Sequence, residues 1–259
     1  MTARNIKDVL DRYSESVNVP AFIDSDPVKF VHKYNLLQDI EVAGILSAIN
    51  AWGRRDMILR DITRILDLMG KSPYDFVMSA NLNALSGNQS LHRTFNMSDL
   101  GYLCRGLRNA YSTYSTIEQY FADKPNLFDG IKSFRMEIIS ANEPSGRSSR
   151  HLSNPDANSA CKRLHLFLRW MVRNDGIVDL GVWKNLSPSE LFIPLDVHVG
   201  KVSRSLGLVS RKQNDRKTVE ELTSVLRQFN PSDPIIYDFA LFGIGLNMQS
   251  QSKSKNFER

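Results

Sequence analysis

Apolar residues recur every three or four positions along most of this chain, a spacing that predicts helices rather than strands. The clearest helical stretches span residues 40–50, 57–69, 98–110, 127–139, 160–172 and 196–206, and two more follow Thr218 and Pro234. No series of strand-like alternating segments stands out, and neither does a repeat of about 20 to 50 residues. We therefore expect an all-α fold over residues 1–259, as a single domain, with a division into two helical lobes as an open alternative.

Residues 140–159 interrupt the helical pattern. This segment is rich in Ser, Asn, Pro, Gly and Arg, and its apolar residues show no periodicity. Such a composition is typical of exposed, irregular chain. We expect a flexible loop over 140–159.

The composition is that of an ordinary globular protein, with 42% hydrophobic and 24% charged residues in a chain of 259. No apolar run approaches the roughly 18 residues of a membrane span, and the N-terminus lacks a signal-peptide pattern. Cys104 and Cys161 lie far apart, and no His, Asp or Glu cluster has the spacing of metal ligands. We expect a cytoplasmic protein with no membrane partner, no metal and no cofactor.

The chain carries a net charge of +5, which favours an anionic partner such as nucleic acid. Many of its basic residues fall between positions 147 and 217. They include Arg147, Arg150, Lys162, Arg163, Arg169, Arg173, Lys201, Arg204, Arg211, Lys212, Arg216 and Lys217. This part of the chain is the expected phosphate-facing surface.

The segment 193–199, IPLDVHV, places Asp196 just after a proline, where extended chain changes to helix. An Asp at such a junction ordinarily caps the helix by accepting backbone N–H groups. The segment also resembles the Pro-Val-Asp-Val-His motif of helix-hairpin-helix DNA glycosylases of the 8-oxoguanine type, in which the Asp is catalytic. The two roles are compatible, because a capping carboxylate is held rigidly at a helix start.

The resemblance implies a catalytic lysine at the start of an earlier helix, and Lys162 in the segment 159–164, SACKRL, is in the corresponding place. Its 34-residue distance from Asp196 is close to that of the archaeal 8-oxoguanine glycosylases. The chain as a whole resembles a bacterial family of unassigned function that is distantly related to these enzymes. The resemblance implies a two-lobed helical bundle with the active cleft between the lobes. The alternative for Lys162 is a solvated lysine on a helix surface.

The Lys/Asp pair fits the chemistry of base removal. Breaking the bond between base and deoxyribose creates oxocarbenium character on the sugar, which a carboxylate stabilises. An amine that has lost its proton can attack the anomeric carbon, and its place in a first helical turn beside Arg163 disfavours the ammonium form. We expect a DNA repair glycosylase, with or without lyase activity, that removes an oxidised purine from double-stranded DNA. The alternative is a non-catalytic DNA-binding or interaction protein that keeps the scaffold.

Further residues follow from the resemblance. Asp238 and Phe242, at i and i+4 on one helix face, correspond to a carboxylate and an aromatic ring that grip the flipped base. The alternative is that Phe242 is a core residue and that Asp238 lies in solvent or near a helix N-terminus. His198 is expected either to contact the substrate or to be a structural histidine.

The segment 49–55, INAWGRR, corresponds to a loop that enters the minor groove in related glycosylases. Trp52, Arg54 and Arg55 could fill or clamp the gap left by the flipped base. The alternative places Trp52 in the core and pairs the arginines with Asp56 or Asp61. The remaining predicted DNA contacts are Arg163, Lys201 and Arg204.

One feature departs from the superfamily pattern. Its hairpin usually reads Leu-Pro-Gly-x-Gly, whereas residues 152–159, LSNPDANS, contain no glycine. Asn158 or Ser159 could cap the following helix, and Asn tolerates a positive φ. We therefore expect a different contact with the DNA phosphate.

Overall fold

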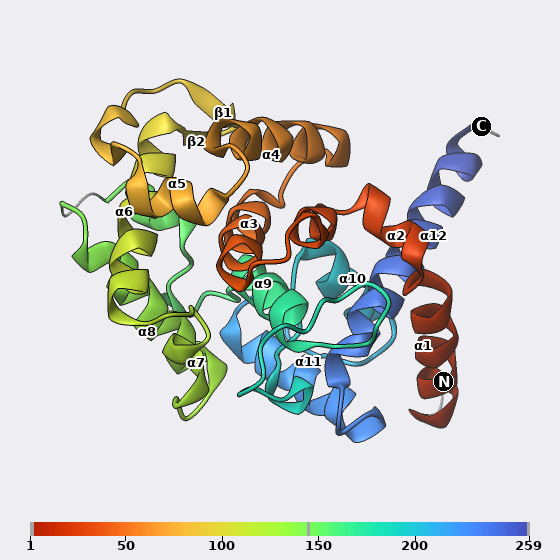
Figure 1. The fold of residues 1–259 in the computed structure, drawn as a ribbon. Coiled ribbons are helices and arrows are strands. Elements are labelled where there is room, and N and C mark those ends of the chain that lie inside the picture. The colour runs from red at the N-terminus through yellow and green to blue at the C-terminus, as the bar shows by residue number, and fades with distance from the viewer. Residues whose placement is uncertain (1–2, 144–145, 258–259) are drawn as a thin grey trace.

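The computed structural model describes residues 3–143 and 146–257, and nearly all of its regular structure is helical (Figure 1). The α-helices are α1 (Ala3–Val17), α2 (Pro20–Ser25), α3 (Leu37–Asn50), α4 (Arg55–Met69), α5 (Pro73–Ser79), α6 (Met97–Thr113), α7 (Gln119–Ala122), α8 (Leu127–Ser140), α9 (Lys162–Val172), α10 (Val197–Ser205), α11 (Arg216–Phe229) and α12 (Tyr237–Phe257). Short 3-10 helices are η1 (Pro27–Lys33), η2 (Leu82–Ala84), η3 (Ser148–His151), η4 (Pro155–Ala157), η5 (Pro188–Glu190) and η6 (Pro234–Ile236). Strands β1 (Ser90–His92) and β2 (Phe95–Asn96) pair as a small antiparallel hairpin, which the sequence pattern did not predict. The all-α prediction is confirmed at this level.

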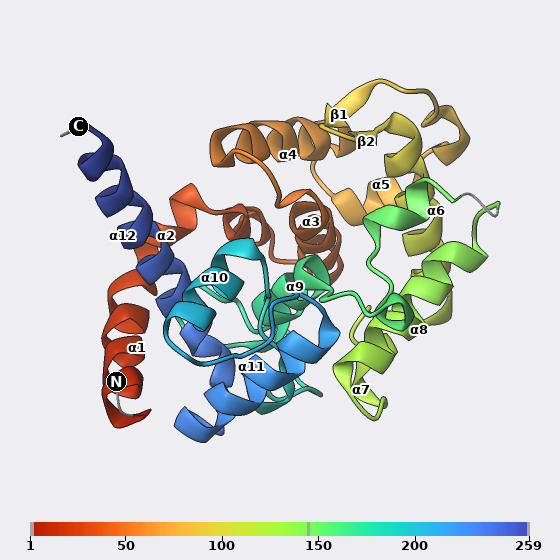
Figure 2. The same ribbon diagram turned by 180° about the vertical axis from the view of Figure 1, so that it is seen from behind.

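Helix α3 lies at the centre of the molecule. Figures 1 and 2 both show it between α5 to α8 on one side and α9 to α12 with α1 on the other. It packs against α9, η1, α4 and α5, and every residue from Asp39 to Asn50 is buried. A helix enclosed on all sides needs apolar residues around its whole circumference, which explains its sequence.

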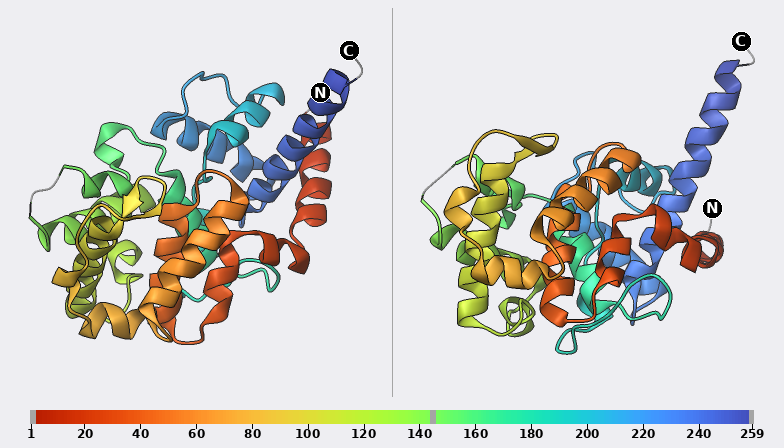
Figure 3. Two further views of the ribbon diagram at one scale, coloured as in Figure 1. Left: turned by 90° about the horizontal axis from the view of Figure 1, so that it is seen from above. Right: turned by 45° about the horizontal axis from the view of Figure 1, so that its top comes forward.

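The C-terminal helix α12 packs along α1 and α10, so that the two ends of the chain are joined in one layer. Figure 3 shows the last turns of α12 projecting beyond the rest of the molecule. Among the described residues, no helix combines the length and the apolar character needed to cross a lipid bilayer.

Side-chain caps mark the first residues of helices α10 and α6. Asp196 is the N-cap of α10, and its side chain accepts the N–H groups of His198 and Val199. The predicted helix over 196–206 is therefore confirmed. Asn96 caps α6 in a reciprocal capping box with Asp99, so this helix begins one residue before the expected position.

The segment 140–159 is less exposed than its composition suggests. Residues 144–145 lie outside the described residues, and the remainder contains η3 and η4, with Leu152 and Pro155 buried. Asp99 of α6 accepts hydrogen bonds from Ser148 Oγ at 2.7 Å and Arg147 Nη1 at 2.8 Å. A buried carboxylate must be hydrogen-bonded, so Asp99 ties this segment to α6. The composition of residues 140–159 did not predict these hydrogen bonds, because Asp99 lies about fifty residues away in the sequence.

Candidate active site

A cleft with a volume of about 1200 Å³ opens at the C-terminal end of α3 and is lined by α9, α10 and α12 together with parts of α2, η1 and α4. Its walls are the starts of α9 and α10, the middle of α12, the turn after α3, the chain around α2 and η1, and the tip of the β1–β2 hairpin. Residues 150–153 complete the rim. The cleft is thus assembled from segments spread over most of the chain.

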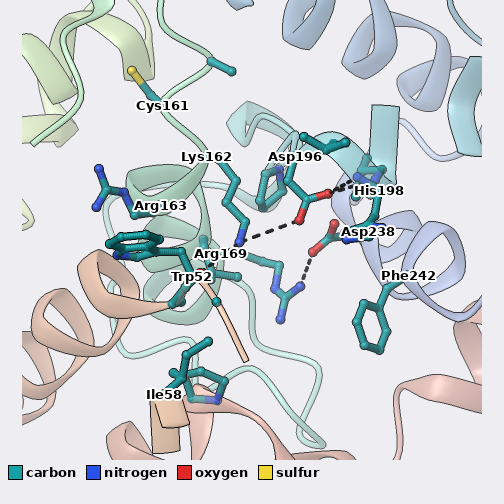
Figure 4. A pocket seen from close by; sticks show the side chains of 18 of the residues that line it. Trp52, Ile58, Cys161, Lys162, Arg163, Arg169, Asp196, His198, Asp238 and Phe242 are labelled. Atoms are coloured by element: carbon teal, nitrogen blue, oxygen red, sulfur yellow. Dashed lines mark hydrogen bonds and ion pairs between the residues drawn. The ribbon is translucent and has the colours of Figure 1, made fainter. Parts of the chain in front are cut away.

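Lys162 and Asp196 face one another in this cleft (Figure 4). Lys162 Nζ lies 3.8 Å from Asp196 Oδ2, and the two side chains are 28% and 36% exposed, so a ligand can reach both. The two carboxylate oxygens of Asp196 have different partners. Oδ1 accepts the N–H groups of His198 at 2.8 Å and Val199 at 2.9 Å, while Oδ2 faces the amine.

Two residues with left-handed backbone bring Lys162 to the cleft. Asn158 has φ +57° and Cys161 has φ +48°, and no side chain caps α9 within the described part of the chain. Asn158 also donates from Nδ2 to Asp215 Oδ2 at 3.1 Å, and its carbonyl accepts the Arg216 N–H at 3.1 Å. Asn tolerates the left-handed backbone better than most residues, and the Asp215 contact holds its side chain in place.

Asp238 forms the back of the cleft with Arg169. One carboxylate oxygen of Asp238 accepts a hydrogen bond from Arg169 Nη1, and Arg169 Nε donates to Asp179 at 3.2 Å. Burial raises the pKa of Asp238 to about 6; Arg169 opposes this rise, and the nearby charge of Asp196 adds to it. Asp238 is buried rather than solvated, and it lies in the first turn of α12, near the helix N-terminus that its alternative also allowed.

Arg169 was expected on the phosphate-facing surface, but it is buried and pairs with Asp179 and Asp238. It lies seven residues after Lys162, which is about two helical turns, so both side chains belong to one face of α9. That spacing was the available signal. A second arginine, Arg173, continues the buried network by pairing with Asp175, Asp179 and Asp233.

Phe242 lines the cleft next to Asp238, on the same helix. The guanidinium of Arg55 lies 4.9 Å from the centre of its ring, and Phe22 meets the ring edge-on at 5.8 Å. Arg55 also lies 3.6 Å from Asp26. Arg55, expected at the DNA surface, therefore covers one face of the ring predicted to stack on a base. Phe22 and Asp26 were missed because they belong to no recognisable motif.

Trp52 lines the cleft and is half-buried, so it is not a core residue. The guanidinium of Arg93 lies 4.5 Å from the centre of its ring. Its indole Nε1 is buried and has no hydrogen-bond partner among the described residues. Arg54 pairs instead with Asp56 at 2.7 Å on the surface, as the alternative for this segment expected.

The other predicted DNA contacts differ in their surroundings. Arg163 Nη1 donates to the Ile49 carbonyl at 2.9 Å, at the C-terminal end of α3. Arg204 donates to the carbonyls of Arg211 and Gln213, and so holds the loop before α11. Both guanidinium groups thus donate hydrogen bonds to backbone carbonyls of the protein itself.

Lys201 and His198 are both exposed on α10, and of the two only His198 lines the cleft. Within residues 3–143 and 146–257, no group of three or more His, Cys, Asp or Glu side chains is placed to hold a metal ion.

Comparison with known proteins gives a family. The model of a family described as a protein of unknown function (DUF2400) matches residues 26–247, a range that contains Lys162, Asp196 and Asp238. Neither a curated protein nor a solved structure matches the chain.

Proposed function

The chain belongs to the DUF2400 family, and we propose that it is a DNA glycosylase that removes an oxidised purine such as 8-oxoguanine from duplex DNA. The proposal depends chiefly on one observation, the pair formed by Lys162 Nζ and Asp196 Oδ2, 3.8 Å apart in an accessible cleft. The two groups come from helix starts 34 residues apart in sequence, yet both can reach the same sugar. We propose that the pair corresponds to the catalytic pair of helix-hairpin-helix glycosylases and that the helices form a two-lobed bundle of that type.

The chemistry assigns one role to each group. The neutral Lys162 amine forms a bond to C1′ of the deoxyribose as the bond from C1′ to the purine nitrogen breaks, and the purine leaves with the electron pair. The Asp196 carboxylate stabilises the positive charge that develops on the sugar. Loss of a proton from the attached nitrogen and opening of the sugar ring give a Schiff base, from which strand cleavage can follow by elimination.

The walls of the cleft suit a purine. The cleft is larger than the roughly 300–1,000 Å³ of typical small-molecule pockets, so it can hold a nucleotide swung out of a duplex. When ionised, Asp238 can accept the N1–H and amino group of the base. The free face of Phe242 can stack on it.

Base release from a duplex that contains 8-oxoguanine opposite cytosine tests the proposal. We expect the native protein to release the base and Lys162→Gln to lower the rate by about 10³-fold or more, since the nucleophile is gone. Lys124→Gln is the matched control, because Lys124 is exposed in the turn between α7 and α8 and does not line the cleft. Duplex binding without release of any oxidised purine in a panel would overturn the glycosylase and favour the non-catalytic DNA-binding alternative.

A further inference from the structure

His92 lies between two hydrogen-bond acceptors behind the cleft wall. It is the last residue of β1 and is 1% exposed. Its Nδ1 lies 2.9 Å from Asp61 Oδ2, and its Nε2 lies 2.9 Å from the Trp52 carbonyl oxygen. A carbonyl oxygen can only accept, and a neutral imidazole has only one N–H. If Asp61 is also only an acceptor, both contacts require a proton on each ring nitrogen.

The surroundings of Asp61 make it an acceptor. Its other oxygen, Oδ1, accepts from Arg60 Nε at 2.9 Å and lies 2.8 Å from Arg60 Nη2. The guanidinium of Arg60 beside this carboxylate favours its ionised form independently of His92, so Oδ2 is an acceptor. The charged groups around the imidazole are therefore Asp61 and Arg60 on α4 and, on the hairpin, Arg93, whose guanidinium stacks on Trp52.

The segment that His92 holds is the part of the cleft wall next to the proposed nucleophile. The Trp52 carbonyl oxygen is the acceptor in this contact, and the Trp52 indole ring meets the imidazole edge-on at 5.8 Å. The preceding carbonyl, that of Ala51, accepts a hydrogen bond from Lys162 Nζ at 3.3 Å. The next residue, Gly53, has φ +109° and lies against the Arg93 side chain. One short segment thus connects His92 with Lys162.

We propose that His92 is a positioning residue held as an imidazolium between Asp61 and the Trp52 carbonyl, and that its charge keeps residues 51–53 against Lys162. On loss of one proton, the imidazole retains the N–H that faces the Asp61 carboxylate, because that bond is charge-assisted. The Nε2 lone pair then opposes the lone pairs of the Trp52 carbonyl, and residues 51–53 move away. The effect on Lys162 rests on the proposed function, whereas the protonation of His92 does not.

Asp61→Asn separates charge from geometry. The carboxamide can donate to an unprotonated Nδ1, which leaves Nε2–H for the Trp52 carbonyl, so a neutral His92 satisfies the same arrangement. NMR of the ¹⁵N-histidine-labelled protein at pH 7 is expected to show both ring nitrogens of His92 protonated in the native chain and only Nε2 protonated in Asp61→Asn. The His92 signals are assigned by their absence in His92→Gln.

The indole N–H signal of Trp52, assigned by its loss in Trp52→Phe, reports the position of the segment. In the native protein it is expected to shift with the same midpoint as the titration of His92, and in Asp61→Asn this shift disappears. The proposal is overturned if His92 carries only one ring proton in the native protein at pH 7. It is also overturned if the indole signal of Trp52 does not change as His92 titrates.

Base release measures the link to Lys162. A glutamine at position 92 can donate to only one of the two acceptors, so His92→Gln is expected to lower kcat about tenfold with little change in KM, because the reacting amine is misplaced. Asp61→Asn is expected to keep the native kcat. His32→Gln is the control, since His32 is exposed and does not line the cleft. An unchanged kcat in His92→Gln contradicts the link, whereas a native protein without any base release contradicts the proposed function and leaves the NMR result to decide the protonation.

Discussion

Asp196 can combine its capping role with the proposed chemical role because its two oxygens have different surroundings. Oδ1 accepts two backbone N–H groups at the start of α10, and Oδ2 faces Lys162. Helix capping and catalysis are therefore not alternatives for this residue. A substitution that keeps Oδ1 and removes the charge can separate the two.

Asp196→Asn retains a good N-cap, so its free energy of unfolding is expected to stay within about 0.5 kcal/mol of the native value, whereas Asp196→Ala loses about 1 kcal/mol. Base release is expected to fall by about 100-fold or more in both variants, because neither carries the carboxylate that stabilises the sugar cation. Urea unfolding and a base-release assay measure the two effects. Native activity in Asp196→Asn would remove the carboxylate from the mechanism.

If Asp238 binds the base as proposed, its raised pKa gives substrate binding a pH dependence. With a pKa of about 6, it is ionised at pH 7 and accepts hydrogen bonds from a purine, whereas at pH 5 it is mostly protonated. Affinity for a duplex with a cleavage-resistant 2′-fluoro-8-oxoguanosine is expected to be about tenfold lower at pH 5 than at pH 7. Asp238→Asn is expected to bind weakly at both pH values. An equal pH effect in this variant would assign the titration to another group.

At the scale of the elements, Glu41 joins the central helix to its surroundings. This carboxylate is fully buried in α3 and accepts hydrogen bonds from Tyr111, Thr116, Trp183 and the backbone of Ile117. The donors come from α6, from the chain before α7 and from the chain after α9. Glu41 thus holds α3 to both groups of helices.

Glu41→Ala leaves these buried donors without an acceptor, and we expect a loss of about 3 kcal/mol or more in the free energy of unfolding. Glu15→Ala removes an exposed carboxylate from α1 and is expected to change it by less than about 0.5 kcal/mol. Urea unfolding curves compare the two. A similar, small loss in both variants would show that Glu41 does not hold α3 in place.

Helices α9 and α10 could be predicted from the sequence because their signals are local, namely apolar periodicity and the cap at Asp196. The contacts that complete the site are not local. Arg169 meets Asp238 across 69 residues, and Arg55 reaches Phe242 on the last helix. Such pairs have no periodicity of their own, so a single sequence does not reveal them. The Lys162 and Asp196 pair was predicted only through resemblance to a known motif.

For the whole molecule, α3 packs against helices of both groups, and the cleft is formed where the segments around α2, α4 and the β1–β2 hairpin meet α12 and the starts of α9 and α10. The chain carries a net charge of +5, and Arg150 is exposed at the rim of the cleft. A basic protein with a cleft of this size can attract a duplex and accommodate one nucleotide from it. The central claim is that the amine of Lys162 attacks that nucleotide.

Borohydride reduction during the reaction with 8-oxoguanine DNA, followed by mass mapping of the trapped peptide, tests this claim most directly. Borohydride converts a Schiff base into a stable amine and so records which lysine attacked the sugar. The account predicts an adduct on the peptide that contains Lys162, and none in Lys162→Gln. An adduct on a different lysine, or no adduct while the base is released, would contradict it.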